Sequence, residues 1–126
     1  MVDSKQHVLI IDDEPLNRDL LRRVLQSTYE LSEAGDASEA IDILEGEEGT
    51  GIQLILCDHL MPGKTGAELA VIVRARWPSI AFMLITGYDG DEEVLQAEAS
   101  GIVDKVLSKP WRSKELRAAI ARGLEA

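Results

Sequence analysis

The segment from Gly51 to Gly66 reads GIQLILCDHLMPGKTG and indicates how the rest of the chain is organised. Residues Ile52 to Cys57 form a short apolar run of strand length, and the run ends on the carboxylate of Asp58. The following Met61-Pro62-Gly63 breaks a strand, and a helical pattern of apolar residues begins near Thr65. The segment therefore predicts a buried strand, a loop with an acid at its start, and then a helix.

The same alternation of strand and helix runs along the chain. Strand character is found at residues 7–11, 29–33, 52–57, 80–85 and 103–107, helical patterns lie at 15–26, 37–46, 65–77, 91–100 and 113–124, and a loop is expected at 47–51. All the strands except 29–33 are apolar on both faces, which requires a parallel sheet covered by helices on both sides. We expect a single α/β domain over residues 1–126, with a flavodoxin-like (βα)5 fold and a doubly wound, five-stranded parallel sheet.

The residues that follow the strands indicate the strand order. Asp12 and Asp58 are 46 residues apart, whereas Asp58 to Thr86 spans 28 residues and Thr86 to Lys109 spans 23. One strand is therefore skipped between Asp12 and Asp58. The skipped strand, 29–33, has the mixed polarity of an edge strand, so the predicted order is 2-1-3-4-5.

This order brings acidic residues together at the carboxyl edge of the sheet, where such folds bind ligands. Asp12, Asp13 and Glu14 follow the first strand, and Asp58 follows the third. Clustered carboxylates repel one another, so a cation is expected among them. Oxygen ligands favour Mg²⁺, and the loop offers no thiol or imidazole pair for zinc. We expect His59 to be a solvent-facing loop residue and not a ligand.

Motifs at four strand ends occur in the order typical of one family. They are the acidic pair Asp12-Asp13, the pattern Asp-x-x-Met-Pro-Gly-x-x-Gly from Asp58 to Gly66, the pair Thr86-Gly87 and the pair Lys109-Pro110. Together they resemble the receiver domain of two-component response regulators, and the resemblance covers nearly the whole chain. Each motif alone would be weak, but their combination is specific.

The resemblance implies a role for each matching residue. Asp58 would accept a phosphoryl group, and Lys109 and Thr86 would contact the phosphoryl oxygens. Mg²⁺, or Mn²⁺, would be bound by Asp13 and Asp58, by Asp12 through water, and by the backbone carbonyl of Leu60. The resemblance also implies a cis peptide bond between Lys109 and Pro110.

The resemblance further implies a signalling phosphoacceptor that is not an enzyme in the usual sense. It would catalyse only its own phosphorylation and a slow autodephosphorylation. The donor would be a sensor histidine kinase or a phosphotransfer protein, and the signal would pass to an output domain or a downstream protein. A homodimer through helix 91–100, strand 103–107 and helix 113–124 would suit their complementary charges.

Two features depart from, or add to, the family pattern. Val106 stands where receiver domains usually carry a Tyr or Phe whose ring turns inward on activation, so we expect the signal to pass instead through residues 86–90 and the following helix. Bulky Leu60 and Tyr88 flank the phosphorylation site and are expected to shield an acyl phosphate from water, unless they only pack against each other.

Simpler interpretations of single residues remain open at this point. Asp12 and Asp13 could favour the start of the first helix, Asp58 could cap the helix at 65–77, and Thr86 and Lys109 could be ordinary turn and solvent-exposed residues.

Other functions for this fold fit the sequence less well. A flavin mononucleotide carrier would not place Asp12-Asp13-Glu14 at its phosphate loop. An aspartyl-phosphate hydrolase would need an acid where Leu60 stands. The serious alternative is a receiver-like interaction module that works without phosphorylation.

Composition bounds the remaining possibilities. The formal net charge is −10, with 23 acidic and 13 basic residues, which argues against direct nucleic-acid binding. No apolar run approaches the roughly 20 residues of a membrane span. Cys57 is the one cysteine and is expected to be a core residue. We expect a cytoplasmic protein that does not bind membranes.

Overall fold

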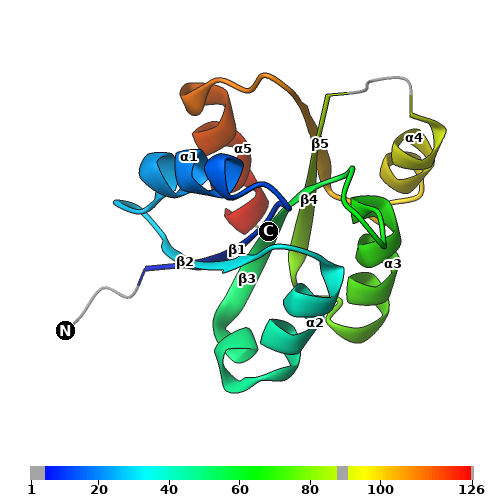
Figure 1. The fold of residues 1–126 in the computed structure, drawn as a ribbon, viewed down its shortest axis with the longest axis horizontal. Helices are drawn as coiled ribbons and strands as arrows, with labels where there is room; N and C mark the ends of the chain where they lie inside the picture. Colours follow the sequence, from blue (N-terminus) through cyan, green and yellow to red (C-terminus); the bar gives the residue numbers. More distant parts are fainter. Residues whose placement is uncertain (1–4, 88–90, 126) are drawn as a thin grey trace.

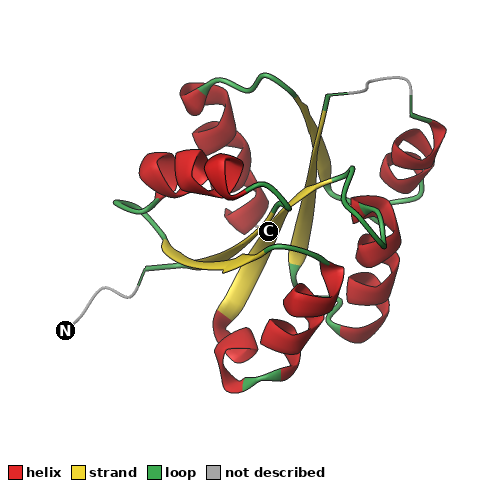
Figure 2. Cartoon of the chain, in the orientation of Figure 1, coloured by secondary structure: helices red, strands yellow, loops and turns green. Residues whose placement is uncertain are grey.

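The computed structural model describes residues 5–87 and 91–125, which form a sheet between two layers of helices (Figures 1 and 2). In chain order the elements are β1 (His7–Ile11), α1 (Pro15–Leu25), β2 (Glu30–Ala34), α2 (Ala37–Glu45), the 3₁₀ helix η1 (Glu47–Gly51), β3 (Ile52–Asp58), α3 (Gly66–Arg76), β4 (Ala81–Thr86), α4 (Glu92–Ala99), β5 (Lys105–Ser108) and α5 (Ser113–Glu125). The expected alternation of strands and helices is confirmed.

All the strand pairs are parallel, and the sheet order is β2-β1-β3-β4-β5, as predicted. The register pairs Ile11 with Cys57, so Asp12 and Asp58 leave adjacent strands at the same level. Asp58 in turn pairs with Ile85 on β4, one residue before Thr86. The register therefore places the carboxyl ends of β1, β3 and β4 at one edge of the sheet.

Alternate residues of each central strand enter two separate cores. On β3, Ile55 and Cys57 belong to the core under α2, α3 and α4, whereas Leu54 and Leu56 belong to the core under α1 and α5. This is the two-residue period of a strand expressed on both faces of one sheet. Figure 1 shows α1 and α5 on one side of the sheet and α2, α3 and α4 on the other.

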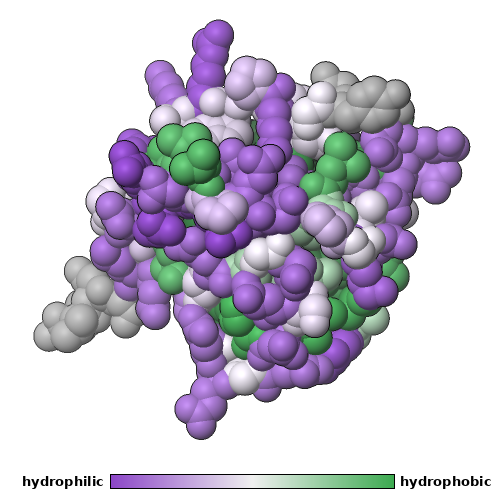
Figure 3. Space-filling view, viewed as in Figure 1, coloured by the Kyte–Doolittle hydropathy of each residue, from purple (hydrophilic) through white to green (hydrophobic). Residues whose placement is uncertain are grey.

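Helix α1 buries only part of its apolar pattern. Leu21 and Leu25 face the core, whereas Leu16 and Leu20 are 76% and 54% exposed. Figure 3 shows apolar surface over α1 within a largely hydrophilic face. Helical spacing therefore identified the helix, but it did not separate core positions from surface positions along it.

Apart from shifts of one residue at element ends, the structure differs from the expected elements at two places. Residues 47–51, expected to be a loop, form η1, in which the amide of Gly49 donates to the carbonyl of Gly46 at 3.1 Å. Strand β5 begins at Lys105 and not at residue 103. Just before it, the Asp104 amide donates to the Phe82 carbonyl at 2.8 Å, but the Phe82 amide donates to the Asp104 side-chain Oδ2 at 2.8 Å and not to a main-chain carbonyl. Neither difference moves the strand ends that carry the candidate site.

Among the described residues, no helix is both long enough and apolar enough to cross a membrane.

Candidate phosphorylation site

Three carboxylates gather at the carboxyl edge of the sheet. Asp12 follows β1, Asp13 follows Asp12, and Asp58 ends β3, and one carboxylate oxygen from each lies within 4.8 Å of the others. Asp12 and Asp58 are buried, and Asp13 is exposed. The predicted acidic cluster therefore exists and is open to solvent on the side of Asp13.

Lys109 reaches this cluster from the end of β5. Its Nζ atom lies 2.9 Å from Asp58 Oδ1, which makes an ion pair at the centre of the site. The Lys109 amide also donates to the carbonyl of Thr86 at 2.9 Å, and the Lys109–Pro110 peptide bond is cis as expected. Lys109 is exposed, as in the simpler interpretation, but these contacts give it specific partners in the site.

Thr86 and Leu60 flank Asp58 in different environments. Thr86 is the last residue of β4 and is 1% exposed, so it is not an ordinary surface turn residue. Leu60 follows in the β3–α3 loop, and it is 59% exposed. Tyr88, which we expected to act with Leu60 as a shield, lies outside the described residues. The shielding of the site thus stays a prediction.

Helix capping does not explain the acids. Thr65, not Asp58, caps α3: its hydroxyl accepts the Glu68 amide at 3.1 Å, and the Glu68 carboxylate accepts the Thr65 amide at 2.8 Å. Asp12 Oδ1 does accept the Glu14 amide at 2.9 Å beside the start of α1. Asp12 therefore orders the β1–α1 turn and also faces Asp58.

The electrostatics of the site centre on Asp58. Burial raises the pKa of its carboxyl above the ordinary value of 3.8, Lys109 opposes the shift, and Asp12 and Asp13 add to it. The pKa of the neighbouring Cys57 thiol is raised well above its ordinary value, mainly by burial and then by Asp58 and Asp12. Cys57 is thus an unreactive core residue, as expected.

The donor set of the acidic cluster fits a hard divalent cation. Its oxygens belong to Asp12, Asp13 and Asp58, and no thiol or imidazole faces them in this set. Oxygen-only ligation suits Mg²⁺ and Mn²⁺ and does not suit zinc. A cation here would also offset the repulsion that raises the pKa of Asp58.

A model of the response regulator receiver domain matches residues 8–121, which include all of these residues. The chain belongs to this family. Receiver domains are the phosphoacceptor parts of two-component response regulators, so the site described above is that of a signalling domain.

Curated relatives of this receiver domain are longer proteins. The hydrogenase transcriptional regulatory protein HoxA of Cupriavidus necator is 33% identical over 126 residues, which are 100% of this chain and 26% of HoxA. The response regulator protein PilR of Pseudomonas aeruginosa is 32% identical over 122 residues, or 96% of this chain and 26% of PilR. The chain thus spans about a quarter of the length of these relatives.

Solved structures show the same fold. The signal receiver domain of an HD domain-containing protein from Pseudomonas fluorescens is 27% identical, with a TM-score of 0.89, over 99% of this chain and 90% of that one. The response regulator TrrA of Thermotoga maritima, in complex with Mg²⁺-BeF, is 28% identical, with a TM-score of 0.81, over 94% of this chain and 99% of that one.

One expectation about this receiver domain was wrong. His59 is 1% exposed, and it does not face solvent. Its amide donates to the Ile85 carbonyl at 3.0 Å, which extends the β3–β4 ladder by one residue, and its Nδ1 accepts the Ala67 amide at 3.3 Å. Its Nε2 faces α4, an element whose position could not be read from the loop sequence. The sequence did carry one signal for the burial of His59, because this residue directly follows a strand that is buried on both faces.

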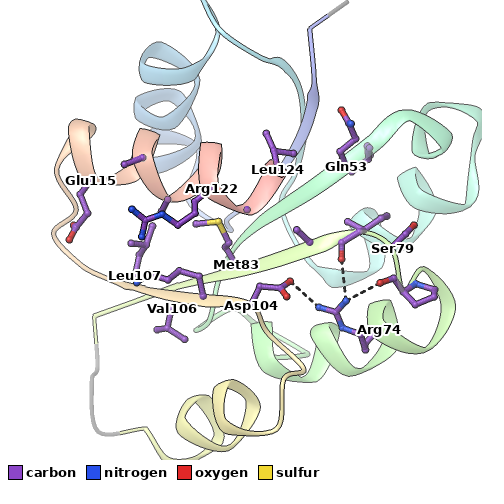
Figure 4. A pocket seen from close by; sticks show the side chains of 18 of the residues that line it. Gln53, Arg74, Ser79, Met83, Asp104, Val106, Leu107, Glu115, Arg122 and Leu124 are labelled. Atoms are coloured by element: carbon purple, nitrogen blue, oxygen red, sulfur yellow. Dashed lines mark hydrogen bonds and ion pairs between the residues drawn. The ribbon is translucent and has the colours of Figure 1, made fainter. Parts of the chain in front are cut away.

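A large groove among the described residues lies away from the acids. It has a volume of about 990 Å³ and runs along the edge strand β5 beside α5. Figure 4 shows Arg74 on one wall beside Asp104, with Val106 and Leu107 toward the other end of the groove. Arg74 Nη2 donates to Asp104 Oδ2 at 3.0 Å. Asp12, Asp13, Asp58 and Lys109 do not line it. A search for a groove alone would therefore not have identified the acidic cluster as the candidate site.

Proposed function

We propose that this receiver domain accepts a phosphoryl group on Asp58 and thereby switches between two conformations. The observation that carries the proposal is the 2.9 Å pair between Asp58 Oδ1 and Lys109 Nζ inside a cluster of three carboxylates. A buried carboxylate with a cation on one side and an oxygen-lined metal site on the other suits transfer of a charged group.

In the proposed reaction, a carboxylate oxygen of Asp58 attacks the phosphorus of a phosphohistidine. The new bond is the P–O bond of an acyl phosphate, and the bond that breaks is P–N. The departing imidazole takes up a proton. Lys109 balances the charge of the phosphoryl oxygens, and the Thr86 hydroxyl donates to one of them.

The residues that would hold Mg²⁺ or Mn²⁺ are Asp13 and Asp58 directly, Asp12 through water, and Leu60 through its backbone carbonyl. When bound, the metal would supply positive charge to the phosphoryl oxygens during transfer. Asp12 is already held by the Glu14 amide, and Arg18 Nη1 donates to the Asp12 carbonyl at 2.6 Å. These contacts support a preformed metal site.

The proposed partners follow from the transfer and from the longer relatives. A sensor histidine kinase or phosphotransfer protein would donate the phosphoryl group, and an output domain or separate protein would receive the signal. We propose that residues 1–126 act as one receiver unit. The groove along β5, which residues of β5 and α5 line, supports a partner contact or a homodimer through the face of α4, β5 and α5.

Acetyl phosphate with Mg²⁺ tests the proposal, with intact-protein mass spectrometry as the readout. We expect one phosphoryl group on the wild-type chain and none on Asp58→Asn. Asp42→Asn, which changes an exposed acid on α2, serves as the matched control and should still be modified. No modification of the wild-type chain, or modification that survives Asp58→Asn, would favour the interaction module that works without phosphorylation.

A further inference from the structure

His59 connects the phosphorylation loop to helix α4. Its Nε2 lies 3.3 Å from Asp91 Oδ2 and 3.4 Å from Glu93 Oε1, and the ring is buried. Asp91 and Glu93 come from the start of α4, 32 and 34 residues further along the chain. A buried side chain next to the phosphoacceptor is thus the meeting point of two elements.

The carboxylates around His59 also hold the first turn of α4 in place. Asp91 caps α4, because its Oδ1 accepts the Val94 amide at 3.2 Å. Glu93 Oε1 accepts the hydroxyl of Thr65, the N-cap of α3, at 3.0 Å. The network therefore joins the β3–α3 loop, the start of α3 and the start of α4 through one imidazole.

The hydrogen bonds assign the tautomer of His59. Because Nδ1 accepts the Ala67 amide, the proton of the neutral ring lies on Nε2. Because one N–H is shared between two carboxylates, the distances from Nε2 to Asp91 and to Glu93 are both longer than in an ordinary unshared hydrogen bond. The same three residues have the composition of a metal site, but a metal at Nε2 would move the proton to Nδ1, against the Ala67 amide.

We propose that His59 is a positioning residue that transmits the state of Asp58 to the first turn of α4. The inference rests on the proposed function. His59 lies between Asp58 and Leu60, the two residues of this loop proposed to bind the metal, so a ligand at the site restrains the backbone on both sides of it. Its ring carries that restraint to Asp91 and Glu93.

This link replaces a coupling that the sequence lacks. Val106 is partly buried against the core beneath α4, and a valine cannot swing a ring between two positions. His59 reaches α4 on the same side of the sheet from the phosphorylation loop itself. The path therefore needs no aromatic residue on β5.

Two substitutions test the two ring nitrogens of His59 separately. The amide oxygen of His59→Asn can replace Nδ1 as the acceptor for Ala67, but it leaves no donor for α4. The amide nitrogen of His59→Gln can replace the Nε2–H donor. Glu93→Gln removes one acceptor charge from the α4 side, and Glu92→Gln changes an exposed acid in the same turn and serves as the control.

Addition of Mg²⁺ and beryllofluoride, followed by NMR, tests the proposal. Fluorine signals report binding at the site, and the amide signals of Val94 and Ala97 report α4. In the wild type and in Glu92→Gln, we expect binding together with shifts at both amides. In His59→Asn we expect retained binding and loss of most of the α4 shift, in Glu93→Gln a reduced shift, and in His59→Gln recovery of most of it.

The outcomes distinguish this inference from the proposed function. Absence of bound beryllofluoride in the wild type would overturn the proposed function and the inference with it. Normal binding with equal α4 shifts in the wild type, His59→Asn and Glu93→Gln would overturn the inference alone. If His59→Asn does not fold, the Glu93→Gln and Glu92→Gln pair decides. Zinc bound at His59 Nε2 would overturn the tautomer on which the link depends.

Discussion

Gly66 shows how closely the backbone packs around Asp58, the proposed phosphoacceptor. A Cβ atom at this position would lie 2.6 Å from Leu84 Cδ2, 2.8 Å from the Asp58 carbonyl oxygen and 2.9 Å from His59 Cα. The Gly66 amide also donates to the His59 carbonyl at 2.7 Å. The first residue of α3 must therefore be glycine for the helix to start directly over the end of β3.

We expect Gly66→Ala to lower the free energy of unfolding by about 1–3 kcal/mol, because the added methyl group meets two backbone atoms that cannot move independently. Urea unfolding would measure the change. Gly35→Ala is the control, since a Cβ there would meet Arg18 Nη1 at an ordinary 3.5 Å. Equal stability of the two variants would contradict the close packing at Gly66.

The raised pKa of Asp58 makes the stability of the domain depend on pH through this single residue. Because the pKa of this carboxyl in the folded state lies above 3.8, the folded protein binds the proton more tightly than the unfolded chain. The protonated Asp58 carboxyl therefore contributes fully to stability below pH 3.8, and this contribution is lost as the pH rises through the folded-state pKa. Without divalent metal at pH 7, the ionised Asp58 is therefore destabilising.

We expect Asp58→Asn to be more stable than the wild type at pH 7 in EDTA, by about 0.5–2 kcal/mol, the usual range for a single stabilising change. The difference should shrink as the pH falls toward 3.8, and Mg²⁺ should reduce it at pH 7. Urea titrations across this pH range measure it. A destabilised Asp58→Asn at pH 7 would show that the Lys109 pair outweighs burial.

At the scale of elements, α1 is tied to the edge strand β2 by charged side chains. Arg22 Nε lies 2.6 Å from Glu33 Oε2, Arg22 Nη2 donates to Glu33 Oε1 at 3.0 Å, and Arg18 Nε lies 3.4 Å from the same carboxylate. The Arg22 hydrogen bond is the largest cause that lowers the pKa of Glu33 below 4.5. The two-point contact fixes the orientation of α1 on β2.

We expect Glu33→Gln to lower the free energy of unfolding by about 0.5–1 kcal/mol at pH 7, a small effect because the pair is partly exposed. Since the pKa of Glu33 is depressed in the folded state, its contribution is present above 4.5 and is lost as the pH falls through the folded-state pKa. The loss should also shrink in high salt. Urea unfolding at several pH values would measure it, with Glu30→Gln, an exposed change on the same strand, as control. If the stability loss caused by Glu33→Gln stays the same at acidic pH, the loss does not come from the ion pairs of Glu33 with Arg18 and Arg22.

At the scale of the whole molecule, one sheet joins two cores to one site. Strands β1, β3 and β4 contribute side chains to both cores, and the ends of these strands carry Asp12, Asp58 and Thr86. A ligand that bridges these ends restrains the sheet and both helical layers together. Binding at the site is therefore linked to the unfolding of the entire domain.

We expect Mg²⁺ at about 100 times its dissociation constant to raise the free energy of unfolding of the wild type by about 2.7 kcal/mol. Asp13→Asn should lose most of this gain, because the substitution removes the negative charge of one of the three carboxylates in the cluster. Asp42→Asn should keep it. Thermal unfolding with and without Mg²⁺ measures the effect, and a full Mg²⁺ response in Asp13→Asn would contradict the proposed ligand set.

Much of the molecule could be predicted from local sequence signals. The apolar runs, the single polar strand at 29–33 and the distances between Asp12, Asp58, Thr86 and Lys109 were sufficient for the sheet order. The same signals also predicted that the acidic residues and Lys109 lie close together. These signals work because strand periodicity and crossover length are properties of short chain segments, and parallel strands present their carboxyl ends on one edge.

The sequence alone determined the fold and the gathering of Asp12, Asp13 and Lys109 around Asp58. Only the tertiary structure decided that His59 is buried, that Leu16 and Leu20 are exposed on α1, and that Glu33 is held by two arginines. The physical reason is that the burial of a loop or helix residue depends on which distant element packs over it. For His59 that element is α4, whose first turn supplies Asp91 and Glu93 from more than 30 residues away.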